Sequence, residues 1–145
     1  MKHHFFSQYI AVLAIFLAID SLWLLVVAPG FYATHLGWLM SKSPNLLAAL
    51  AFYLLYVVGI IMLPLARAVQ EQSYASAIRF GGVFGLCAYA TYDLTNMATI
   101  DNWPAIVTFV DLAWGTILTA LTTVIAYHFV GRQAAVKSLA KRPKA

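Results

Sequence analysis

Four long runs of apolar residues, each interrupted by few charges, make up most of this 145-residue chain. They cover residues 8–28, 45–66, 77–97 and 105–130. A run of about 18 or more such residues is long enough to cross the hydrocarbon core of a bilayer as a helix. The sequence therefore predicts an all-α fold, a four-helix transmembrane bundle, as a single membrane domain over residues 1–131.

The composition excludes the other common classes of protein. Charged residues make up 10% of the chain and hydrophobic residues 63%, whereas a soluble domain is about a quarter charged. A disordered chain would need low hydrophobicity and a high net charge. The single cysteine, Cys87, has no partner in the chain. The chain by itself can therefore form neither a disulfide nor a thiolate metal site.

The basic residues predict the orientation of the bundle. With four spans both termini lie on one side, which then holds Lys2, Arg67, Arg79 and the five basic residues of the tail at 132–145. Lys42 is the only base on the other side. By the positive-inside rule both termini are cytoplasmic, and residues 132–145 form a basic cytoplasmic tail beside anionic lipid. We expect no binding of nucleic acid.

Prolines and aromatic residues mark the expected ends of the spans. Pro29-Gly30 is expected to end the first span, and Pro104 suits the first turn of the fourth. Trp and Tyr are common where a helix leaves the bilayer. We therefore interpret four aromatic residues in the first and third connections as interfacial anchors: Phe31, Tyr32, Trp38 and Trp103.

Three aspartates, Asp20, Asp93 and Asp111, fall inside the predicted spans. An aspartate at the centre of a membrane helix costs about 2.5 to 3.5 kcal/mol on insertion scales, so a compensating partner is expected for each. With the predicted orientation and about 1.5 Å of rise per residue, all three fall in the outer half of the membrane. We expect them to converge on the interior of the bundle in one layer.

Polar and aromatic side chains at helical spacing accompany the three aspartates. Small residues, including Gly85 and Gly115, would let the third and fourth helices approach closely. An acidic and aromatic pocket is therefore expected within the bundle. Besides the aspartates, its candidate residues are Asn96, Tyr89, Tyr92, Trp23, Trp114, Tyr53 and Tyr56.

Five motifs resemble those of a known family. They are Ala-Ile-Asp20-x-x-Trp-Leu, Ala-Phe-Tyr53-x-x-Tyr, Tyr89-Ala-Thr-Tyr-Asp93-Leu-Thr-Asn96-x-Ala-Thr, Trp103-Pro and Val110-Asp111-x-x-Trp-Gly115. The pattern covers roughly residues 7–130 and resembles a family of small bacterial predicted membrane proteins, the domain of unknown function 2177 family. The resemblance implies a multi-pass protein of the bacterial inner (cytoplasmic) membrane with four spans. It implies no activity, substrate or cofactor.

Three classes of function fit these features. The first is a cation or proton-coupled transporter or binding protein, in which the aspartates supply charge and the aromatic rings supply cation–π contacts. The second is a lipid- or isoprenoid-modifying enzyme that uses aspartate as acid and base. The third is a structural or accessory subunit whose polar layer specifies the bundle. No catalytic motif in the sequence names a reaction.

Partners follow from the same features. The lipid bilayer is one, and a cationic or lipophilic small molecule is a second. Any homo-oligomer should be parallel, because the charge bias fixes one orientation. If a metal ion binds, oxygen ligands would suit Mg²⁺ or Mn²⁺, and Asp20, Asp93 and Asp111 would hold it with Asn96.

Overall fold

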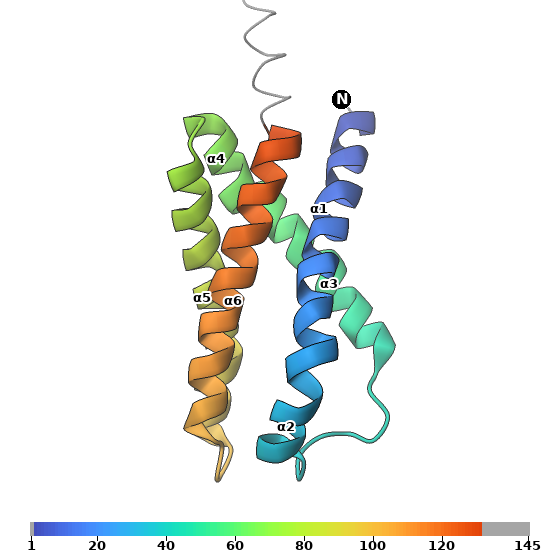
Figure 1. The fold of residues 1–145 in the computed structure, drawn as a ribbon, viewed down its shortest axis with the longest axis vertical. Helices are drawn as coiled ribbons and strands as arrows, with labels where there is room; N and C mark the ends of the chain where they lie inside the picture. The colour runs from blue at the N-terminus through green and yellow to red at the C-terminus, as the bar shows by residue number, and fades with distance from the viewer. Residues whose placement is uncertain (1, 132–145) are drawn as a thin grey trace, which may run out of the picture.

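The structure is a computed structural model that describes residues 2–131. This part of the chain is helical apart from short connections and contains no strand. Four helical rods lie side by side, and the N-terminal end of the first rod lies at the same end of the bundle as the last described residues (Figure 1). The predicted all-α four-helix bundle is confirmed. The predicted basic tail lies outside the described residues.

The first rod is longer than predicted, because its helix does not end at Pro29-Gly30. It consists of α1 (Lys2–Leu22), a π-helical turn η1 (Trp23–Val27) and α2 (Ala28–Leu36). Pro29 lies in the first turn of α2, where a missing N–H costs least. The wider π turn just before it leaves space for the proline ring, which would otherwise clash with the preceding turn. The expected helix end at Pro29-Gly30 is therefore wrong.

The second rod consists of α3 (Leu46–Ile60), the π-helical turn η2 (Ile61–Leu65) and α4 (Ala66–Glu71). The side chain of Asn45 caps its start by accepting a hydrogen bond from the N–H of Ala48 at 3.1 Å. Pro64 lies inside η2, so a second proline is accommodated by a π turn. Figure 1 shows α3 running obliquely to the other helices, with its first turns away from α5 and α6.

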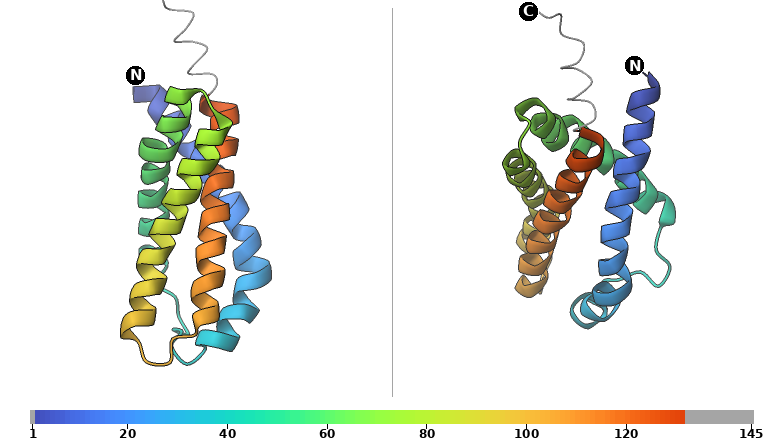
Figure 2. Two further views of the ribbon diagram at one scale, coloured as in Figure 1. Left: turned by 90° about the vertical axis from the view of Figure 1, so that its left-hand side faces the viewer. Right: turned by 45° about the horizontal axis from the view of Figure 1, so that its top comes forward.

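Helices α5 (Tyr74–Thr99) and α6 (Ala105–Ala126) form the most closely packed pair, and α6 continues into a third π turn, η3 (Tyr127–Gly131). They run antiparallel side by side (Figures 1 and 2). A Cβ atom on Gly81 of α5 would lie 2.8 Å from the hydroxyl oxygen of Thr123 on α6. Only glycine permits this approach, which agrees with the predicted contact through small residues.

Three helical segments are long and apolar enough to cross a membrane: Phe5–Leu36, Leu46–Glu71 and Ala105–Phe129. Helix α5, the third predicted span, has 26 residues and is about 39 Å long at 1.5 Å per residue. It therefore matches the others in length, but it is less apolar and is not among the three. It lies beside α6, which is one of them.

Candidate functional site

The three aspartates are buried inside the bundle. Asp20, Asp93 and Asp111 are 5%, 0% and 6% exposed. On α6, Asp111 lies between Val107, which belongs to a small apolar cluster, and Leu118, which belongs to the main core. A polar layer therefore separates two apolar clusters.

Asp20 of α1 holds three helices together. The hydroxyl of Tyr53 on α3 donates to Asp20 Oδ2 at 2.8 Å, and the indole N–H of Trp114 on α6 donates to Asp20 Oδ1 at 3.4 Å. The Trp114 ring stacks on Trp23, with ring centroids 4.7 Å apart and planes 13° apart. The two Asp-x-x-Trp pairs of the sequence thus meet in space. Both oxygens of Asp20 have donors, which offsets the cost of its burial.

Asp111 has a different partner, which the sequence did not indicate. The hydroxyl of Tyr32 on α2 donates to Asp111 Oδ1 at 2.5 Å. A first helix that ends at Pro29 would place Tyr32 at the membrane interface, as the sequence predicts. Tyr32 and Leu36 are one helical turn apart and both face the bundle. That spacing could have identified Tyr32 if the helix had been continued past the proline.

Asp93 of α5 has no donor at all among the described residues. Its side chain is fully buried, and neither Oδ1 nor Oδ2 has a hydrogen-bond partner. Buried polar atoms nearly always have a partner, and an unpaired one carries its full desolvation cost. Asp93 is therefore the least compensated group in the layer.

A cavity of about 520 Å³ lies beside Asp93. Its wall includes both Asp93 and Asp111 and comes from α2, α3, α5, α6 and the connection after α2. Three lining side chains, Met40, Phe52 and Tyr92, are 50%, 45% and 59% exposed. The remaining lining residues are Tyr32, Leu36, Tyr56, Ala88 and Tyr89. The cavity is thus acidic and aromatic, and it is exposed on one side.

The structure divides the predicted pocket into two groups. Asp93, Asp111, Tyr56, Tyr89 and Tyr92 line the cavity. The other group, Asp20, Tyr53, Trp23 and Trp114, forms the hydrogen-bonded and stacked cluster described above. Asn96 is half-buried and lines no part of the cavity.

Trp103 is not the interfacial anchor that the sequence predicted. It is 7% exposed and packs in the small cluster with Leu36 and Val107. Its indole N–H donates to the hydroxyl of Thr108 at 3.0 Å, and its ring meets Tyr92 edge to face at 5.9 Å. Because its N–H has a partner inside the protein, the ring does not need the membrane surface. Trp38, by contrast, is 61% exposed.

The aspartates do not form a shared metal site. Within residues 2–131 no three His, Cys, Asp or Glu side chains are grouped so that they could hold a metal ion. Asp20 is bound to Tyr53 and Trp114, while Asp93 and Asp111 line the cavity. The geometry therefore gives no support to a metal held by all three.

Comparison with known proteins places the chain in one family. Residues 5–128 match the family model described as predicted membrane protein (DUF2177). The chain belongs to this family. No curated protein and no solved structure matches it. All three aspartates lie within the matched residues.

Proposed function

We propose that this protein binds a lipophilic organic cation inside the helix bundle, as the binding step of a transporter in the bacterial inner membrane. The observation that carries the proposal is Asp93, whose fully buried carboxyl group has no hydrogen-bond partner within residues 2–131 and lines a cavity of about 520 Å³. An ionised carboxylate buried without a partner costs several kcal/mol. A cation in the cavity would offset that cost.

The charge of the cavity wall supports a positive ligand. Asp93 and Asp111 both line the cavity, and among the residues that the structure describes no Lys, Arg or His lines it. The single Tyr32 hydroxyl satisfies only part of Asp111. The wall thus presents acceptors for positive charge and no competing base.

The aromatic lining supports an organic cation rather than a metal ion. Five of the lining residues carry aromatic rings: Tyr32, Phe52, Tyr56, Tyr89 and Tyr92. Ring faces attract weakly hydrated cations such as quaternary ammonium groups. The cavity also falls in the size range of pockets for small organic ligands, about 300–1,000 Å³.

The position of the exposed lining residues supports entry from the bilayer. Phe52 and Tyr92 come from α3 and α5, whose facing parts diverge where α3 slants away (Figure 1). Both are large aromatic residues, which are compatible with contact with acyl chains. A ligand that partitions into lipid could therefore reach Asp93 from the side.

Equilibrium dialysis of the purified full chain tests the proposal. The probe is tetraphenylphosphonium, and neutral triphenylphosphine oxide is the control ligand. We expect the cation to bind and the Asp93→Asn variant to weaken binding at least about tenfold, as truncating one side of a buried charge pair does. Asp101→Asn makes the same change at an exposed position in the α5–α6 connection and should leave binding unchanged. Equal binding of the two ligands, or unchanged binding by Asp93→Asn, contradicts the proposal.

Reconstitution separates the classes of function. A transporter would carry the bound cation across the membrane of reconstituted proteoliposomes, and Asp93→Asn would abolish that flux.

A lipid- or isoprenoid-modifying enzyme is the second candidate function. Two carboxyl groups with different surroundings, Asp93 and Asp111, line one cavity, and such a pair suits a general acid and a general base. An enzyme would release an altered lipid product rather than move an unchanged cation.

A further inference from the structure

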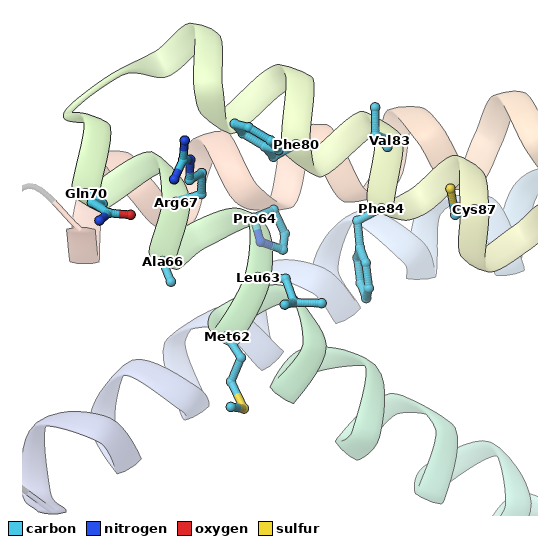
Figure 3. Close-up of a pocket in the computed structure, with 10 residues that line it drawn as sticks. All are labelled: Met62, Leu63, Pro64, Ala66, Arg67, Gln70, Phe80, Val83, Phe84 and Cys87. Atoms are coloured by element: carbon cyan, nitrogen blue, oxygen red, sulfur yellow. The ribbon is translucent and has the colours of Figure 1, made fainter.

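A second cavity, of about 600 Å³, lies between the end of the second rod and α5 (Figure 3). The residues of η2 and α4 that line it include Met62, Leu63 and Arg67, and those of α5 include Phe80 and Cys87. We call it the groove. None of its lining residues lines the cavity beside Asp93.

The groove is polar at one end and apolar along the rest. Arg67 and Gln70 lie near the tight α4–α5 connection at Gln72 and Ser73. From Phe80 to Cys87 the helix rises about 10 Å toward the middle of the bundle, at 1.5 Å per residue. The side chains at the far end are Met62, Leu63, Val83, Phe84 and Cys87. This is the pattern of an amphiphile, with a polar head and an apolar chain.

The polar end carries excess positive charge. Arg67 lines the groove, and Arg79 lies beside it without lining it. Their guanidinium carbons lie 5.5 and 4.7 Å from the centroid of the Phe80 ring, which does line the groove. Glu71 is the only acid paired with either one in the described part of the chain. It accepts a bond from Arg67 Nε at 2.7 Å and another from the Ser76 hydroxyl. Two cations thus face one carboxylate, and Arg79 is left without an acidic partner.

We propose that the groove binds an anionic phospholipid, with its headgroup at Arg67 and Arg79 and an acyl chain along Leu63, Phe84 and Cys87. Acyl chains contact any lipid-facing surface, so the new element is selection for headgroup charge. Basic pockets between membrane helices select anionic headgroups in this way. A second copy of the chain is a poorer occupant, because a symmetric contact would bring four arginines together.

Native mass spectrometry of the purified full chain tests this. Phosphatidylglycerol and phosphatidylcholine with identical acyl chains are titrated in parallel. One uncompensated arginine predicts about a fivefold preference for phosphatidylglycerol. We expect Arg79→Gln to abolish that preference and Glu71→Gln, which removes the competing carboxylate, to increase it. Lys42→Gln removes an exposed base from the opposite end of the bundle and should leave it unchanged.

A blocking variant tests whether the lipid lies in the groove. Val83 is 54% exposed and lines the groove, so Val83→Trp should weaken the tightest phosphatidylglycerol binding severalfold. Unchanged binding by Val83→Trp, or an equal loss of preference in Arg79→Gln and Lys42→Gln, would overturn the proposal. The gain expected for Glu71→Gln cannot arise from misfolding. None of these variants touches Asp93, so the outcome is independent of the proposed cation binding.

Discussion

A Cβ atom on Gly85 of α5 would lie 2.1 Å from the carbonyl oxygen of Gly115 on α6. No real Cβ atom approaches an oxygen so closely, so the two backbones meet at this point because Gly85 has no side chain. The contact sets the spacing of the α5–α6 pair, and this pair carries Asp93 and Asp111.

The first prediction concerns this contact. Gly85→Ala should lower the free energy of unfolding by about 1–3 kcal/mol, because the added methyl group overpacks the interface. The measurement is unfolding of the purified protein in mixed micelles. Gly30→Ala is the matched control, since a Cβ on Gly30 meets nothing within 4 Å. It should be neutral or slightly stabilising, because alanine favours the helix over glycine. Equal destabilisation by the two variants would argue against close packing at Gly85.

The second prediction contrasts the two cavity aspartates in the ligand-free protein. Asp93→Leu removes a buried carboxyl group that has no hydrogen-bond partner in the described part of the chain, so it should raise the free energy of unfolding by about 1–3 kcal/mol. Asp111→Leu removes the acceptor of the Tyr32 hydroxyl and should lower it by a similar amount, about 1–3 kcal/mol. Thermal or denaturant unfolding of the two variants measures both. A change of the same sign in both would show that their environments do not differ as described.

The third prediction concerns the bond between Tyr53 and Asp20. A double-mutant cycle of Tyr53→Phe and Asp20→Leu, each of which removes the hydrogen bond, should give a coupling energy of about 0.5–3 kcal/mol, because the two side chains are in direct contact. Tyr9→Phe serves as the comparison, since the Tyr9 hydroxyl donates to the backbone oxygen of Leu54 at 2.8 Å instead. The effect of Tyr9→Phe should add to that of Asp20→Leu. Additive behaviour of the Tyr53 pair would exclude the bond.

The fourth prediction concerns orientation in the membrane. The uneven distribution of bases predicts cytoplasmic termini. In a Cys87→Ser background, Ser41→Cys in the first connection should react with an impermeant maleimide added to intact cells. Gln72→Cys, in the connection between α4 and α5, should react only after the cells are opened. The reverse pattern would invert the topology and place the buried aspartates nearer the cytoplasm.

The sequence by itself determined the class of fold and the identity of its most costly residues. Long apolar runs indicate membrane helices because a bilayer requires each backbone polar group to be satisfied within its own segment. The burial of Asp20, Asp93 and Asp111 follows from the cost of exposing a carboxylate to lipid. Both inferences depend on local composition and on general solvation energies, so they need no knowledge of which helices meet.

Only the tertiary structure decided which side chains share a site. Tyr32 reaches Asp111 because the first helix continues past Pro29 through a π turn, a local adjustment that no hydrophobic pattern reveals. Asp20 and Asp93 both lie inside predicted membrane spans, at a similar expected depth. Asp20 nevertheless accepts hydrogen bonds from two donors, whereas Asp93 accepts none from the described residues. That difference depends on the tilt and rotation of helices packed against one another. These arise from many contacts between distant segments, so they cannot be read from spacing along one helix.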